Sequence, residues 1–228
     1  QRISSYYANG GYTFLGKYTF NGGIRIDESN LFGKDKSAQN RPVWSVGLAW
    51  ELGKESFMKS HTWLDRLALR SSYGITGNSP EVGTAASSDI LTVVTNLNYP
   101  GGTGLSLQMP ANRALSWETT KTFNVGIDFA ILGNRLSGTI DLYHKKTEDL
   151  IGEMTLNPFT GFPTITGNAG KMTNKGIDLS ISSANLQQGA LKWRTTFNMA
   201  YNQNKITSLN STIPISLGSD MITQAYLE

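Results

Sequence analysis

The sequence predicts an all-β fold, an antiparallel meander of roughly eight strands, and two observations support it. Apolar residues fall on every second position through long stretches, which is the period of an extended strand. Short segments rich in Gly, Asn, Asp and Pro separate these stretches, and runs with helical periodicity are nearly absent. A run of about 18 apolar residues, as a transmembrane helix requires, is also missing. Without cysteine there is neither a disulfide framework nor thiolate chemistry.

The pattern is clearest between Trp117 and Lys146, which we interpret as a central hairpin. Its first strand carries apolar side chains at every second position from Phe123 to Ile131, and the alternation resumes at Leu136 after a Gly-Asn turn. Two alternating runs joined by such a turn are typical of a β-hairpin. The polar face includes Asp128 and Asp141. The apolar face therefore lies either in a dry core or against lipid, and this hairpin alone leaves both readings open.

The same alternation predicts the remaining strands in order. One example sets Trp44, Val46, Leu48 and Trp50 against Ser45, Gly47 and Ala49. By this criterion six further strands are expected, at residues 3–14, 18–28, 42–52, 66–75, 174–184 and 190–206. Residues 53–65 leave room for a helical turn, and residues 76–116 and 150–173 are expected to be long loops without strands.

The lengths of the connections favour a membrane barrel over a soluble sandwich. In a meander, alternate connections lie at the same end of the sheet. One end receives residues 15–17, 53–65, 132–135 and 185–189, of which three are tight turns. The other end receives the three long ones, residues 29–41, 76–116 and 150–173. Outer-membrane barrels have short periplasmic turns and long extracellular loops, and their strands are of about ten residues or more. We therefore predict a transmembrane antiparallel β-barrel.

Several segments, in this order, resemble the SusC/RagA-type TonB-dependent outer-membrane transporters of Bacteroidota. The matching segments are RLALRSSYGITGN (residues 66–78), LSWETTKTFNVGIDF (115–129), DLYHKKTEDLI (141–151), GF (161–162), GNAG (167–170) and NKGIDL (174–179). Asp178 stands where the family's last motif usually has Glu. The resemblance implies the distal part of a larger barrel of roughly 22 strands, of which about eight are here.

The resemblance also implies a function and partners. Members import oligosaccharides or peptides across the bacterial outer membrane, are coupled to the TonB complex through an N-terminal plug, and work with a SusD-like surface lipoprotein. We expect residues 1–228 to form part of a single barrel domain without that plug, embedded in outer-membrane lipid. Both ends of the sequence look cut, so we expect a piece of a longer chain. The alternatives are a complete eight-strand structural or adhesive barrel and, less favoured, a soluble β-sandwich that binds carbohydrate.

Candidate solute-binding residues lie on the polar faces of the strands and in the loops. Charges expected to face the lumen either bind solute or pair with one another or with a plug. Loop aromatic residues either stack on a sugar or peptide or hold the loops in place. The candidates from both groups are Arg70, Asp128, Asp141, Tyr99, Phe159 and Phe162.

Other kinds of site find little support in the sequence. The two histidines, His61 and His144, have no evident catalytic partners, so we expect neither an enzyme nor a resident cofactor. The segment 27–30 is acidic but lacks the ligand series of a calcium loop, and we expect no metal site. The net charge of +3 is small and scattered, which argues against nucleic-acid binding.

Overall fold

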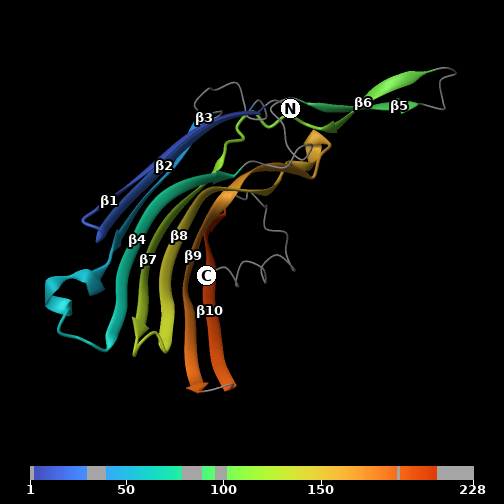
Figure 1. The fold of residues 1–228 in the computed structure, drawn as a ribbon. Coiled ribbons are helices and arrows are strands. Elements are labelled where there is room, and N and C mark those ends of the chain that lie inside the picture. Colours follow the sequence, from blue (N-terminus) through green and yellow to red (C-terminus); the bar gives the residue numbers. More distant parts are fainter. Residues whose placement is uncertain (1–2, 30–39, 79–88, 96–101, 189–190, 210–228) are drawn as a thin grey trace.

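The computed structural model describes residues 3–29, 40–78, 89–95, 102–188 and 191–209, and it confirms the all-β antiparallel meander. Eight strands form one curved sheet in the order β1-β2-β3-β4-β7-β8-β9-β10 (Figure 1). The strands are β1 (Ile3–Phe14), β2 (Tyr18–Ser29), β3 (Asn40–Trp50), β4 (Leu64–Asn78), β7 (Glu118–Ile131), β8 (Leu136–Thr155), β9 (Thr164–Gln188) and β10 (Leu191–Leu209). The sheet is open, with β1 and β10 at its edges.

Tight turns join neighbouring strands at one end of the sheet, as predicted. The β1–β2 turn places Leu15 and Gly16 at φ 53° and 64°, and the β7–β8 turn places Leu132, Gly133 and Asn134 at φ 58°, 66° and 60°. Left-handed backbone at successive positions matches the twist of antiparallel hairpins. The longer β3–β4 connection holds the expected helical turns, η1 (Leu52–Lys54) and η2 (Ser56–Met58). Within the described ranges, no helix is long and apolar enough to cross a membrane.

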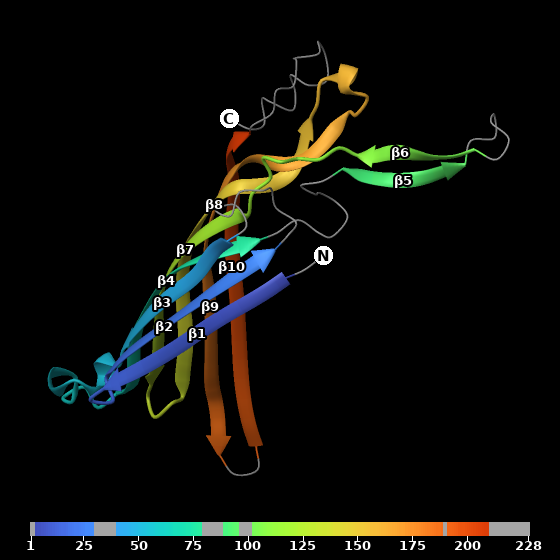
Figure 2. The same cartoon turned by 90° about the horizontal axis from the view of Figure 1, so that it is seen from above.

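Two of the expected long loops contain regular structure, so those predictions were wrong in part. Residues 76–116 include a separate hairpin, β5 (Ile90–Thr95) and β6 (Thr103–Met109), which projects away from the main sheet (Figures 1 and 2). Residues 150–173 are mostly strand, because β8 and β9 continue pairing to Thr155 and Thr164. Only a short connection with η3 (Pro158–Thr160) remains between them.

Burial in the sheet is inverted relative to a soluble protein. The large apolar side chains of the strands are exposed, with Phe123 at 48%, Leu48 at 58% and Phe197 at 53%. Among the described residues, the buried apolar side chains are few and mostly small: Ala68, Ala130, Ala184, Leu115 and Trp117. A water-soluble sheet of this composition would bury the first group. Lipid against the apolar face explains the pattern, and we call this face the outer face.

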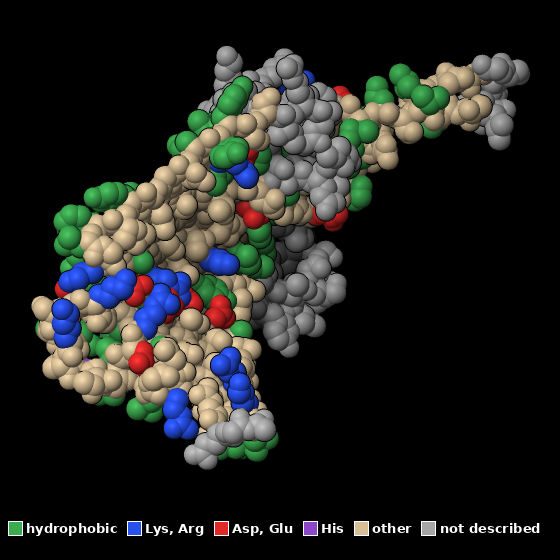
Figure 3. All heavy atoms as spheres, in the orientation of Figure 1, with side chains coloured by type: hydrophobic (Ala, Val, Ile, Leu, Met, Phe, Trp, Pro, Cys, Tyr) green, Lys and Arg blue, Asp and Glu red, His purple; other side chains and the backbone are tan. Residues whose placement is uncertain are grey.

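The strand registers place the polar residues together on the opposite, inner face. Asp128 pairs with Ala68 and Thr139, while Gly126 pairs with Arg70 and Asp141. Because side chains alternate between the two faces of a strand, these residues share one face. Hydrophobic side chains lie along the outer left margin in Figure 3, while Lys, Arg, Asp and Glu gather across the face turned to the viewer.

Candidate functional site

Arg70 on β4 is the centre of a charged cluster on the inner face. Its Nε lies 3.0 and 3.1 Å from the two carboxylate oxygens of Asp128, and its Nη2 lies 2.8 Å from Asp128 Oδ1. The same Nη2 lies 3.1 Å from Asp141 Oδ1. Arg66 Nη2 also belongs to the cluster: it lies 3.0 Å from Glu51 Oε1 and 3.7 Å from Asp128 Oδ2. One guanidinium thus links three strands, β4, β7 and β8.

Gly126 makes this link geometrically feasible. It lies on β7 directly between Arg70 and Asp141 in the register. A Cβ atom at this position would overlap Asp141 Oδ1 and would lie 2.9 Å from Arg70 Nη2. The absence of a side chain lets the guanidinium cross the strand and reach the second carboxylate. The cluster is therefore part of the structure of the sheet, with the polar groups of Arg70, Asp128 and Asp141 directed at one another.

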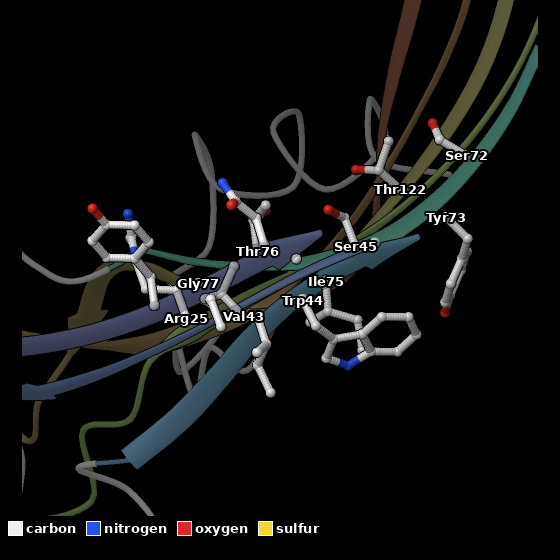
Figure 4. A pocket seen from close by; sticks show the side chains of 16 residues that line it. Arg25, Val43, Trp44, Ser45, Ser72, Tyr73, Ile75, Thr76, Gly77 and Thr122 are labelled. Atoms are coloured by element: carbon white, nitrogen blue, oxygen red, sulfur yellow. The ribbon is translucent and has the colours of Figure 1, made fainter. Parts of the chain in front are cut away.

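A hollow of about 660 Å³ lies on the inner face, towards the end of the sheet that bears the long connections. Residues from five strands line it, among them Tyr7, Arg25, Ser45 and Ser72. Figure 4 shows Ser45, Ser72 and Thr122 on one side of the sheet and the rings of Trp44 and Tyr73 on the other. We call this site the inner hollow. Its hydroxyls, a cation and one aromatic ring are groups that bind sugars or peptides.

The pairing of β3 with β4 ends at the inner hollow. The last residue pair at this end is Trp44 with Ile75, and Pro42 lies two residues before Trp44 in β3. Proline has no N–H to donate to a neighbouring strand. Arg25 is held at the hollow by Asp27, whose Oδ2 lies 2.8 Å from Arg25 Nε. The sequence analysis did not single out Tyr7 or the hydroxyl-bearing residues of the hollow, because small polar residues alternate along every strand.

The predicted loop aromatic residues do not join the Arg70 cluster. Phe159 lies in η3 with its side chain 99% exposed, and Phe162 is half-buried in the same connection. Asn157 shapes this turn by accepting a hydrogen bond from Phe159 N at 3.0 Å. Tyr99 lies outside the described residues. The structure thus brings three of the six candidates together and separates Phe159 and Phe162 from them.

The β5–β6 hairpin carries an apolar stripe on one face. Leu91 pairs with Leu107 and Val93 with Leu105, so these four side chains lie side by side. Their exposed fractions run from 38% for Leu107 to 68% for Leu105. An apolar stripe of this kind on a projecting hairpin is a candidate contact surface for another molecule.

Asn168 on β9 fixes the segment that joins this hairpin to β7. Its side-chain amide accepts a hydrogen bond from Ser116 N at 2.9 Å and donates one to Ser116 O at 3.0 Å, in the manner of a strand partner. It also donates to Asp149 O at 2.8 Å. Leu115 and Trp117, on either side of Ser116, are buried. The hairpin therefore projects from a fixed base on the extension of β8 and β9.

At the tight-turn end of the sheet, three donors converge on Glu55 in the β3–β4 connection. Tyr18 Oη lies 2.6 Å from Glu55 Oε1, Lys17 Nζ lies 2.9 Å from Oε2, and Trp50 Nε1 lies 3.1 Å from Oε1. The hydrogen bond from Tyr18, followed by those from Lys17 and Trp50, lowers the pKa of Glu55 from 4.5 to about 2. Glu55 thus fastens the β1–β2 turn to the β3–β4 connection.

This lowered pKa predicts a stability difference confined to acid. A carboxylate whose pKa is depressed on folding stabilises the folded state above its ordinary pKa, and this contribution is lost as the pH falls towards about 2. Glu55→Gln removes the titrating group, so its melting temperature is expected to lie below that of the unsubstituted protein at pH 6 and to approach it at pH 3. Thermal unfolding of the full-length protein in detergent measures this. A gap between the two proteins that stays constant with pH would contradict the role assigned to Glu55.

Comparisons with known proteins bear on the whole sheet. The family model described as "TonB dependent receptor-like, beta-barrel" matches residues 1–221. The TonB-dependent receptor SusC of Bacteroides thetaiotaomicron is 35% identical over 213 residues, covering 91% of this chain and 21% of SusC. The TonB-dependent receptor P39 of Formosa agariphila is 33% identical over 222 residues, covering 97% of this chain and 21% of that protein.

Solved structures agree with these matches. The RagAB peptide importer in its closed-closed state superposes with a TM-score of 0.83 at 30% identity, over 92% of this chain and 23% of the importer chain. The siderophore receptor PirA of Pseudomonas aeruginosa superposes with a TM-score of 0.59 at 16% identity, over 89% of this chain and 32% of that chain, a likeness of fold alone. The chain spans about a fifth of the length of the curated relatives it matches, 21% in each case above.

Proposed function

Because this chain belongs to the TonB-dependent receptor β-barrel family and is of the SusC/RagA type, we propose that it forms part of the wall of an outer-membrane nutrient importer. In this proposal residues 1–228 lie within a single barrel domain of roughly 22 strands and supply about a third of its circumference. The observation that carries the proposal is the division of the sheet into an exposed apolar outer face and a polar inner face. The open edges at β1 and β10 support it, because a barrel leaves no unpaired edge in the bilayer.

The imported solute is an oligosaccharide or a peptide, taken up by TonB-driven movement of a plug that these residues do not include. RagAB, at 30% identity, is described as a peptide importer, and SusC is described as a TonB-dependent receptor. The inner hollow offers hydroxyl donors, the Arg25 guanidinium and the Tyr7 ring, which suit either solute. The wall binds and guides the solute and performs no catalysis.

Substitution of the inner hollow tests this function. Tyr7→Ala removes the exposed ring, and Ser72→Leu fills part of the hollow, each in the full-length protein expressed in its own membrane. Loss of one aromatic contact is expected to weaken uptake about threefold to tenfold at limiting solute. Uptake of labelled oligosaccharides and of labelled peptides by intact cells is the measurement.

The matched control is Gln203→Leu, which alters an exposed residue of β10 on the outer face and is expected to leave uptake unchanged. Immunoblots of outer membranes establish equal amounts of each protein. The proposal fails if both hollow variants, present at normal levels, import every tested solute as fast as the control.

We propose that a SusD-like lipoprotein covers the end of the barrel that bears the long connections, and that the apolar stripe of the β5–β6 hairpin contacts it. Replacing Leu91, Val93, Leu105 and Leu107 with threonine keeps strand propensity and removes the apolar surface. Co-purification of the lipoprotein with the tagged full-length barrel is expected to fall at least about tenfold, because interface contacts concentrate in a few apolar anchors.

A matched variant changes the other face of the same hairpin, with Thr92→Ser and Ser106→Thr. It is expected to retain the lipoprotein at the normal ratio. If the four-threonine variant retained the lipoprotein at the normal ratio, the hairpin would not be part of the interface.

A further inference from the structure

Two hollows follow one another along the outer face of β1, β2 and β3. The first, of about 630 Å³, lies among Tyr12, Phe20, Leu48 and Trp50 near the tight-turn end. The second, of about 350 Å³, continues along the same strands at Gly10 and Gly22, beside Val46 and Trp44. Phe20 and Gly22 are successive outward positions of β2, so the two hollows adjoin. We call them together the outer trough.

Missing side chains produce the outer trough. Gly10 and Gly22 pair directly across β1 and β2, and both lie in the outward row. A Cβ atom at Gly10 would meet nothing within 4 Å, and one at Gly22 would lie 3.7 Å from Ser45 O. Neither glycine is therefore needed for a turn or for close approach of two backbones. Ser71, which pairs with Leu48, has a small side chain and therefore deepens the trough further.

The walls and length of the outer trough fit a hydrocarbon chain. Its side chains are apolar and accessible, with Tyr12 67% and Phe20 52% exposed. From the Tyr18–Trp50 pair to the Ile24–Trp44 pair, β2 advances by six residues. At about 3.3 Å per residue this is roughly 20 Å. The hydrocarbon of one leaflet is about 15 Å thick, so a tilted chain would span it.

The tight-turn end of the outer trough is basic. Lys17 lies in the β1–β2 turn, and Lys54 Nζ donates to Gly16 O of the same turn at 2.8 Å. An ammonium group has three donors, so Lys54 retains others for an anion. The Glu55 carboxylate between them is occupied by Tyr18, Lys17 and Trp50. The cluster of two lysines and one glutamate keeps an excess positive charge where the apolar trough ends.

We propose that the outer trough binds a phospholipid of the periplasmic leaflet, with an acyl chain along Gly10 and Gly22 and the phosphate against Lys17 and Lys54. The inference depends on the membrane placement in the proposed function. A single flexible chain fits a channel bounded by side chains on both sides, and the charge at its end complements a phosphate. The tight-turn end of such barrels faces the periplasm, so the lysines lie at the level of the inner-leaflet headgroups.

Native mass spectrometry of the full-length barrel tests this, with 1-palmitoyl-2-oleoyl-phosphatidylglycerol added to the detergent. The unsubstituted protein is expected to hold one lipid that survives detergent exchange. Gly10→Leu combined with Gly22→Leu fills the trough and is expected to abolish its retention. Lys17→Gln with Lys54→Gln is expected to lower retention about twofold to fivefold. Gln203→Leu, on the outer face of β10, is expected to retain the lipid fully.

Equal lipid retention by the trough-filled variant and the Gln203→Leu control would overturn the proposal. A second measurement does not use the variant in which the trough is filled. Phosphatidylglycerol brominated on its acyl chain is expected to quench Trp50, measured as the fluorescence difference from Trp50→Phe, and absence of quenching would also overturn it. Solute uptake by the trough-filled variant is expected to stay normal because the trough lies outside the lumen, which separates this proposal from the transport function.

Discussion

Arg70→Met is expected to lower the free energy of unfolding of the full-length barrel by about 1–3 kcal/mol. The substitution leaves the carboxylates of Asp128 and Asp141 on the inner face without the guanidinium that both of them contact. Removing one partner from a buried charge cluster costs about 3–5 kcal/mol, and the estimate is lower here because Arg70 is 38% exposed. The temperature at which the barrel loses its folded gel mobility measures the effect.

Removing the two carboxylates as well is expected to restore part of the lost stability. Arg70→Met combined with Asp128→Asn and Asp141→Asn is expected to melt above Arg70→Met alone, since no unpaired charge remains. A triple variant less stable than the single one would show that Arg70 acts through contacts other than these two carboxylates. Solute uptake at a permissive temperature separates the two roles considered for these residues. A purely structural cluster lowers stability and leaves the solute concentration for half-maximal uptake unchanged.

Gly176→Ala is expected to destabilise the barrel by about 1–3 kcal/mol through overpacking. A methyl group there would overlap both Tyr143 Oη and the backbone carbonyl of Tyr201. Tyr143 crosses β9 over this glycine, and its hydroxyl accepts a hydrogen bond from Asn202 Nδ2 on β10 at 3.1 Å. Relieving this overlap therefore requires either a shift of the paired strands β9 and β10 or displacement of the Tyr143 side chain from its position over β9.

Gly10→Ala is the matched control for this prediction, because a methyl group there meets open space. Its effect is expected to lie within about 0.5 kcal/mol of zero. Equal melting temperatures for the two alanine variants would contradict the packing described at Gly176. A low melting temperature for both would point to a general requirement for glycine in these strands.

The sequence predicted the strands of the main sheet well because lipid and lumen impose a strict period of two. It failed where that period breaks while pairing continues. Asp149 has φ 56° and lies in a register shift between Thr147 and Ile151, so the alternation is lost although β8 runs on to Thr155. The β5–β6 hairpin was missed for another reason. Its alternating residues, such as Leu91 and Val93, form runs too short to stand out within a polar segment.

The candidate site shows the same limit. The sequence placed Arg70, Asp128 and Asp141 on polar faces, and they do lie together on the inner face. It could not show that they pair, because β4 and β7 are separated by residues 79–117 and their register is set only in three dimensions. The sequence could not predict the inner hollow for the same reason, since Tyr7 and Ser72 lie on strands that are not neighbours.

The central claim is that one face of this sheet meets lipid and the other meets a polar lumen. Nitroxide labels placed singly at residues 123–130 of β7 in the full-length protein, reconstituted in lipid bilayers, test it most directly. Labels at Phe123, Val125, Ile127 and Phe129 are expected to collide more with oxygen, which partitions into lipid, than with a water-soluble nickel complex. Labels at Asn124, Asp128 and Ala130 are expected to show the opposite preference. A period-two pattern of the reverse phase, or no alternation between the two sets, would contradict the account.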